Sequence, residues 1–251
     1  MNCLDFLEFI KSEFGNLGSE EGLRYKYYED EINGIVVCWM VSKKVLDFTV
    51  KNKFNLLIAH EDLYFPPEYA GGDKSGVVSD FRKEILEKNR INFLRLHYTI
   101  DKNFIFDVFD QLSGGKILIK ENLYRVYEFE NKKLENVAKE LKKRYKVEFL
   151  RITEPNKKVK RVGCLVGGLG LSINSKFIDK ILSYNVDTVI AGEVDEYTIR
   201  ALSDLKIGII ELGHEVSETP GLIKFTQYLK KKLPEITVKY LKNGYPVKIL
   251  K

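Results

Sequence analysis

The 251-residue sequence has few cysteines and no long apolar run. Its three cysteines, Cys3, Cys38 and Cys164, lie far apart and form no CxxC pair. This spacing argues against a disulfide framework or a thiolate zinc site and favours a reducing compartment. No window approaches the roughly 18 consecutive apolar residues of a membrane-spanning helix, and the first residues contain no apolar block typical of a signal peptide. We therefore expect a cytoplasmic protein that has no membrane partner.

Glutamine is also scarce, whereas Lys and Glu are abundant and charged residues make up 31% of the chain. Hydrophobic residues account for 44%, which predicts a well-filled core and excludes a disordered chain. The net charge is +5, with basic clusters at 142–144, 157–161 and 230–232. Two of these clusters close amphipathic helices, where cations favour the negative end of the helix dipole. The alternative is a weak binding surface for nucleic acid or phosphate, although no base-reading motif accompanies it.

Apolar runs alternate with amphipathic segments along the chain, which predicts strands alternating with helices. The expected strands lie within 34–40, 54–60, 91–97, 123–129, 147–152, 161–166, 188–191 and 207–212, and the expected helices at 4–14, 43–53, 79–88, 102–112, 134–145, 175–184, 196–202 and 220–233. This order is typical of parallel sheets with helices on their faces.

Two related α/β lobes, with mostly parallel sheets flanked by helices, fit this pattern better than one. We place the first lobe at residues 1–125 and the second at 126–251, with the C-terminal helix a candidate for packing back on the first lobe. The polar segment Thr153–Asn156 contains a proline between two apolar segments and is the best linker candidate.

All three histidines fall at the end of an apolar run, and each has carboxylates close behind. His60 is followed by Glu61 and Asp62, His97 by Asp101, and His214 by Glu215 and Glu218. In open α/β sheets, ligands bind at the carboxyl ends of the strands. Imidazole and carboxylate together suit Zn, Fe or Mn. The pattern therefore predicts a metal site at the strand ends.

Each histidine segment also has a simpler interpretation. His60-Glu61-Asp62 is compatible with an ordinary polar turn, and Asp101 with the N-cap of the helix at 102–112. Before the last helix, Thr219 is a candidate cap, with Pro220 in the first helical turn. Glu218 then merely complements the helix dipole. These alternatives stay open, but three similar sites make a stronger case than one.

The glycine-rich segment at 166–172 follows a strand and precedes a helix, where phosphate-binding loops occur. Ile173 stands where GxGxxG has its third glycine, and the P-loop lysine is absent. We therefore favour a tight turn or an oligomer contact. The sequence contains no GxSxG motif and no cysteine beside a histidine, which disfavours nucleophilic serine or cysteine chemistry.

Five segments, in order along the chain, resemble motifs of the Nif-three-like family, whose bacterial members carry the name GTP cyclohydrolase 1 type 2. They are NLLIAHEDLYF at 55–65, HYTID at 97–101, the strand and GGxG at 161–170, the segment at 191–197, and GHEVSE at 213–218. The resemblance implies a two-lobed α/β fold that forms a hexameric ring around dinuclear metal sites.

Carried over residue by residue, the resemblance implies two divalent ions held by His60, Glu61, Asp101, His214 and Glu218. It implies for His97 the role of a neighbouring group or catalytic proton shuttle. Glu61 replaces a family histidine, which makes the site richer in oxygen and favours Fe or Mn over Zn.

Two further departures from the family leave the metal and the substrate open. Glu193 stands where the family has Asp, and Tyr197 where it often has His. The leading hypothesis is a metal-dependent hydrolase acting on a nucleotide-like substrate. The alternatives are a non-catalytic homohexameric ring that binds nucleic acid (DNA) through its lysines, and a protein of metal storage or delivery.

Overall fold

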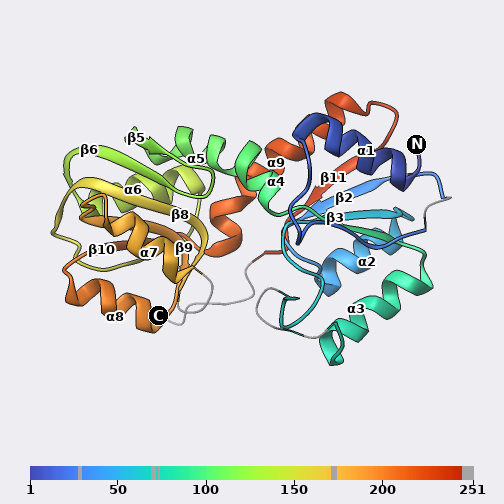
Figure 1. Cartoon of the computed structure of the whole chain (residues 1–251), viewed down its shortest axis with the longest axis horizontal. Helices are drawn as coiled ribbons and strands as arrows, with labels where there is room; N and C mark the ends of the chain where they lie inside the picture. Colours follow the sequence, from blue (N-terminus) through green and yellow to red (C-terminus); the bar gives the residue numbers. More distant parts are fainter. Residues whose placement is uncertain (28–29, 69–71, 73, 171–173, 245–251) are drawn as a thin grey trace. The chain divides into compact units, whose positions relative to one another are not determined.

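A computed structural model describes residues 1–27, 30–68, 72, 74–170 and 174–244. The chain divides into two compact units, Met1–Asn103 with Leu222–Lys251, and Phe104–Gly221. Each unit consists of a sheet with helices packed on it, as Figure 1 shows. The α/β class predicted from the sequence is confirmed.

The first unit contains a five-stranded sheet in the order β1-β4-β3-β2-β11. Its strands are β1 (Gly22–Tyr25), β2 (Ile35–Cys38), β3 (Leu56–Ala59), β4 (Asn92–Arg95) and β11 (Val238–Leu241). All neighbours are parallel except β1, which runs antiparallel to β4. Strands β2, β3 and β4 are buried along their whole length, as expected for a parallel sheet covered on both faces.

Helices cover both faces of this sheet (Figure 1). On one face lie α1 (Cys3–Phe14) and the C-terminal half of α9 (His214–Lys232), where Phe14 packs against Phe225 and Tyr228. On the other face lie α2 (Lys43–Lys51) and α3 (Val77–Lys88), whose apolar side chains share a core with alternate residues of β2 and β3. The strand ends that carry His60 and His97 are therefore held from both sides.

The two segments that lead to His60 and His97 share a local pattern. Residues 51–60 read KNKFNLLIAH and residues 88–97 read KNRINFLRLH. Both segments begin with Lys-Asn, continue with Lys or Arg, an apolar residue and Asn, and end in His. In each, an Asn closes the preceding helix, and the next residue, Lys53 or Arg90, has a positive φ, of 56° and 51° respectively. This left-handed residue ends the helix and turns the chain into the strand.

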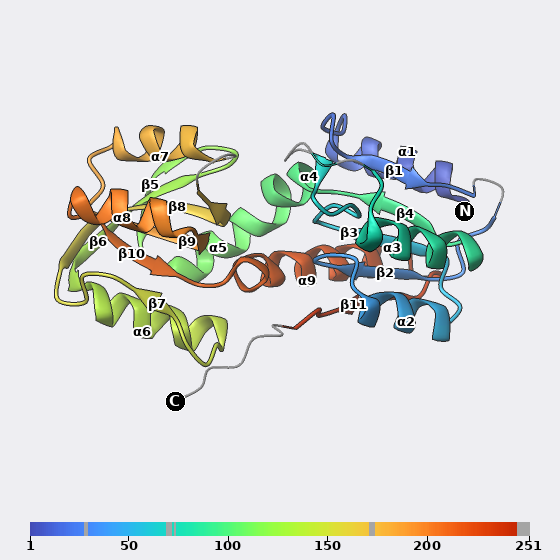
Figure 2. The same cartoon turned by 90° about the horizontal axis from the view of Figure 1, so that it is seen from below.

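The second unit contains a six-stranded sheet in the order β5-β6-β8-β9-β10-β7. Its strands are β5 (Lys116–Lys120), β6 (Arg125–Lys133), β7 (Arg151–Ile152), β8 (Lys158–Leu169), β9 (Thr188–Val194) and β10 (Gly208–Glu211). Only the β8-β9-β10 pairings are parallel, so this sheet is mixed. Helix α6 (Leu134–Tyr145) lies on one face, and α7 (Ser175–Leu182) and α8 (Glu196–Asp204) lie on the other (Figure 2).

The last helix begins earlier than predicted. Helix α9 starts at His214, and Pro220 lies inside it, so Thr219 is not the cap and Pro220 is not in the first turn. The reason is Gly213, which has a φ of 97° and whose carbonyl accepts the backbone N–H of Ser217 at 2.9 Å. This first helical hydrogen bond places both His214 and Glu218 on the helix.

The helix predicted at 102–112 is also built differently. A short helix, α4 (Tyr98–Ile100), runs into a π-helical turn (Asp101–Ile105), which continues as α5 (Phe106–Ser113). Asp101 is therefore inside helical structure, and the N-cap interpretation of Asp101 is wrong.

Strands β1, β5 and β11 were not predicted. No helix in the described part of the chain is long and apolar enough to cross a membrane.

Candidate metal centre

The first unit brings His60, Glu61, His97 and Asp101 together. His60 follows β3 directly and is fully buried, with its backbone N–H bonded to the carbonyl of Cys38. Its Nε2 donates a hydrogen bond to Oδ1 of Asp101 at 2.9 Å, and its Nδ1 lies 3.6 Å from Oε1 of Glu61. Each of His60, His97 and Asp101 offers one ligand atom, and these atoms lie within 4.8 Å of one another.

Asp101 reaches this group because one helical turn separates it from His97. The backbone N–H of Asp101 bonds to the carbonyl of His97 at 3.0 Å, which closes the turn between the two residues. Residues four apart on a helix lie on the same face. The HxxxD spacing read from the sequence is therefore a helical turn placed at the end of β4.

Two glutamates that the sequence analysis did not single out hold the His97 segment. Glu21 is buried, and its Oε1 accepts the backbone N–H groups of His97 and Thr99, each at 2.8 Å. Oε1 of Glu20 accepts a hydrogen bond from Nδ1 of His97 at 3.0 Å. Both glutamates precede β1, and the pairing of Gly22 with Arg95 sets them beside the end of β4. No local motif in the sequence predicts this contact.

Charged neighbours shift the pKa values of Glu20 and His97. The hydrogen bond from His97 is the main reason that the pKa of Glu20 is lowered, and Arg95 adds to the effect. Burial and the nearby His60 act to lower the pKa of His97. The carboxylates of Asp101, Glu20 and Glu61 outweigh these two effects, so the pKa of His97 is raised.

Arg95 offsets part of the negative charge around the histidines. Its guanidinium is fully buried, with Nη1 at 3.3 Å from Oε2 of Glu20 and 3.9 Å from Oδ2 of Asp62. Asp62 also accepts the backbone N–H groups of Tyr64 and Glu68, at 3.4 and 3.0 Å, so it shapes the following loop. Several buried carboxylates around two imidazoles form a donor set that fits a divalent cation.

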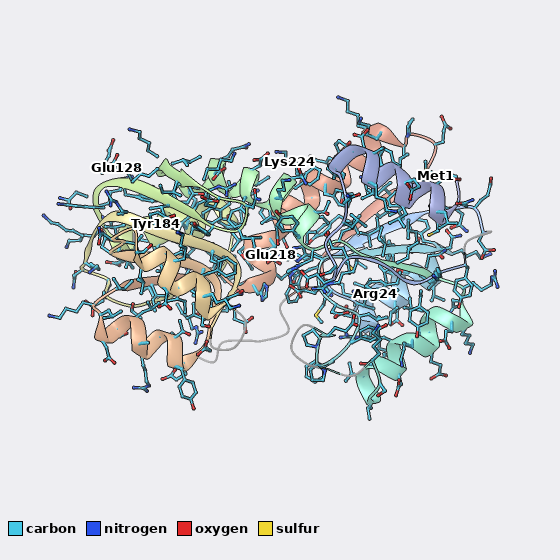
Figure 3. All side chains as sticks on the ribbon, viewed as in Figure 1. Met1, Arg24, Glu128, Tyr184, Glu218 and Lys224 are labelled. Carbon is cyan, nitrogen blue, oxygen red and sulfur yellow. The ribbon has the colours of Figure 1, made fainter. Side chains whose placement is uncertain are left out.

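The second unit brings together His214, Glu218 and Glu193. Nε2 of His214 lies 3.4 Å from Oε1 of Glu218, which is four residues further along α9 and buried. On the other side of the ring, Nδ1 donates to Oε2 of Glu193 in β9 at 3.1 Å. Figure 3 labels Glu218 on the helix ribbon. The predicted residues His214 and Glu218 are therefore neighbours, and Glu193 holds the histidine ring.

The glycine-rich segment lies directly against this pair. Gly167 has a φ of 76°, and a Cβ there would collide with Oε1 of Glu218 and lie 3.1 Å from Nε2 of His214. Its backbone N–H bonds to Oγ of Ser217 at 3.0 Å. The irregularity between Leu165 and Gly168 in the pairing of β8 with β9 falls at the same point.

Gly167 and Gly168 are thus part of β8, and Gly167 leaves space for the side chains of His214 and Glu218, which the sequence analysis did not foresee. The residues at 171–173, including Ile173, lie outside the described part of the chain. Tyr197, at a position where the resemblance suggested a family histidine, is 72% exposed on α8.

Comparisons with known proteins agree with this architecture. A family model described as Duf34/NIF3 (NGG1p interacting factor 3) matches residues 7–244. A protein of Clostridium acetobutylicum named GTP cyclohydrolase 1 type 2 homolog is 23% identical over 236 residues, which covers 88% of this chain and 84% of that protein. A protein of the same name from Buchnera aphidicola is 35% identical over 72 residues, 29% of each chain.

Solved structures show the same fold. The protein ybgI, described as of unknown function, superposes with a TM-score of 0.82 at 20% identity, covering 98% of this chain and 100% of its own. Reduced HcgD from Methanocaldococcus jannaschii has a TM-score of 0.76 at 22% identity, with 96% and 98% covered. The Staphylococcus aureus protein SA1388 has a TM-score of 0.78 at 16% identity, with 100% and 99% covered.

Proposed function

The chain belongs to the Duf34/NIF3 family, and from this premise we propose that it is a metal-dependent hydrolase acting on a nucleotide-like substrate. The proposed ligands of two divalent ions are His60, Glu61, Asp101, His214 and Glu218. The nucleotide class of the substrate is taken from the name GTP cyclohydrolase 1 type 2 homolog that two relatives carry.

One observation carries the proposal: the ring nitrogens of the buried His60 lie 2.9 Å from Oδ1 of Asp101 and 3.6 Å from Oε1 of Glu61, so that two buried carboxylates face one histidine. Carboxylates gathered at such a site repel one another unless a cation compensates them. The space beside Gly167 supports the same proposal for His214 and Glu218, because a side chain there would displace both. The share of oxygen ligands favours Fe or Mn.

The chain's own groups have distinct tasks in such a hydrolase. A bound divalent ion would supply Lewis-acid activation of water and of an electrophilic substrate. In the proposed function, His97 accepts or returns a proton through Nε2, because its Nδ1 is bonded to the carboxylate of Glu20. Glu193 fixes the ring of His214 in the same manner.

Metal analysis of purified protein tests the proposal. We expect wild-type protein to contain bound divalent metal, and both the His60→Ala/Asp101→Ala and the His214→Ala/Glu218→Ala double variants to lose metal. Wild-type protein should release product from GTP or a related nucleotide in a chelator-sensitive reaction, and both variants should be inactive. Unchanged metal content in both folded variants would refute the ligand assignment. Metal binding without turnover of any nucleotide would refute the hydrolase.

A nucleic-acid-binding homohexamer is the second candidate. It is supported by exposed basic residues at the beginning of β8, Lys158, Lys160 and Arg161, in the second unit. Contacts of this kind release counterions from the phosphate backbone, so binding to DNA should weaken steeply as salt increases. Salt-dependent DNA binding by a hexamer, with no metal-dependent turnover, would favour this candidate over the hydrolase.

A further inference from the structure

His97 is fixed in place at both its ring and its backbone. Glu20 accepts the hydrogen bond of Nδ1, and Glu21 accepts the backbone N–H. Glu21 also bonds to the N–H and hydroxyl of Thr99, at 2.8 and 2.9 Å. Glu20 is itself held by Arg95, whose Nη1 lies 3.3 Å from Oε2. A side chain held at this many points loses little further entropy when it binds a ligand.

The contact with Glu20 decides which ring nitrogen faces the candidate site. An ionised carboxylate only accepts hydrogen bonds, so Nδ1 carries the proton in the neutral imidazole, the form that binds metal, and Nε2 keeps its lone pair. Nε2 lies 4.0 Å from Oε1 of Glu61, and the ring centroids of His97 and His60 are 4.4 Å apart. A carboxylate on the nitrogen opposite the metal is the usual arrangement around a metal-binding histidine.

We infer that His97 is itself a metal ligand, completing a set of two histidines and one carboxylate with His60 and Asp101 inside the first unit. Glu20 is the positioning residue that presents Nε2 of His97. This inference rests on the proposed function, since it requires that the chain binds metal, but it replaces the proton shuttle with a ligand. Sets of this composition leave coordination positions open and suit Fe(II).

Imidazole NMR tests the inference on the unmodified protein. The chain has three histidines, so long-range proton–nitrogen spectra of the full-length, metal-free protein contain three ring systems, which single His→Ala variants assign. With Zn²⁺ as a diamagnetic probe, we expect the Nε2 signal of His97 to move together with the ring signals of His60, while Nδ1 stays protonated. Ring nitrogens of His97 that do not move while His60 moves would overturn the inference.

Zn²⁺ titration of variants provides the second measurement. Glu20→Gln should weaken binding about 10–100-fold, the usual effect of removing such a supporting carboxylate, whereas Glu31→Gln, at a side chain 89% exposed in the same unit, should not. His97→Ala should weaken binding as much as His60→Ala. Thermal unfolding checks that each variant folds.

The two possible failures are distinguishable. If His60→Ala and Asp101→Ala lose Zn²⁺ but His97→Ala and Glu20→Gln bind as wild type, the inference fails and the proposed function stands. If His60→Ala and Asp101→Ala also bind as wild type, the proposed metal site itself fails.

Discussion

His60 and His214 were predicted from the same pattern, a histidine at the end of an apolar run, but different kinds of structure hold them. His60 is fully buried and bonded to Asp101, which is 41 residues away in the sequence. His214 lies at the start of a helix and has Glu218 one turn further along the same helix. The first group depends on contacts between distant segments, and the second depends largely on local helical geometry.

The comparison teaches where each group is vulnerable. In the first unit, buried charges balance one another, with Arg95 among several carboxylates. In the second unit, the room for side chains is limited, because the backbone of Gly167 lies directly against Glu218 and His214. Charge-removing substitutions should therefore disrupt the first group most, and volume-adding substitutions the second.

Arg95→Met should have the largest effect. It removes the buried cation that lies between Glu20 and Asp62, and removing one partner of a buried ion pair typically costs about 3–5 kcal/mol. The free energy of unfolding is measured by urea denaturation, followed by the fluorescence of Trp39, the single tryptophan, which lies in the first unit. The matched control is Arg90→Met, at an exposed pair with Asp30, which should cost about 1 kcal/mol or less. Equal costs would contradict the charge-balance argument.

Gly167→Ala should have the next largest effect, about 2–4 kcal/mol, because the side chain meets both a left-handed backbone and a collision with Glu218. Exposure of Cys164, the cysteine of the second unit, to a thiol reagent in urea measures this unit's stability. Gly168→Ala is the control, since its Cβ would lie 3.5 Å from His214, an ordinary contact. A Gly167→Ala protein as stable as Gly168→Ala would show that space is not limiting here.

Ser217→Ala should destabilise the second unit by about 1–2 kcal/mol, because it leaves the buried N–H of Gly167 without its hydroxyl acceptor. The same Cys164 assay applies. Ser183→Ala removes an exposed hydroxyl that bonds locally to Lys180 and should change stability by less than about 0.5 kcal/mol. If the two variants were equally stable, the hydrogen bond from Gly167 to Ser217 would not contribute to the stability of the second unit.

Removing metal should have the smallest effect on stability, and the rate of cysteine labelling should show that it affects the first unit more than the second. Burial raises the pKa of the Cys3 thiol to about 12 and that of Cys164 well above its ordinary value. Below these values the thiols stay protonated in the folded state, so labelling at pH 8 requires local opening. With chelator present, Cys3 and Cys38 of the first unit should label several-fold faster, because uncompensated carboxylates repel, and Cys164 should change less. A larger increase in the labelling rate of Cys164 than of Cys3 and Cys38 would contradict the idea that charge balance matters most in the first unit.

Much of the fold was readable from the sequence because its signals are local. The helix at 134–145 was predicted to the residue, and Ser42 caps α2 as expected, with its hydroxyl accepting the N–H of Val45. The edge strands β1 and β11 were missed, because four-residue strands carry too little periodicity to separate them from loops. The beginning of α9 was misplaced because Thr219-Pro220 imitates a helix start.

The sequence by itself determined that His60 and His97 follow buried strands, because apolar runs and helix-ending asparagines are local signals. It also determined that His97 and Asp101, and His214 and Glu218, are each four residues apart. Only the tertiary structure decided that Glu20 and Glu21 hold His97, because antiparallel pairing of β1 with β4 joins segments about 75 residues apart. It alone decided that Gly167 makes room for His214 and Glu218, since a close approach between a strand and a helix leaves no periodic trace in the sequence.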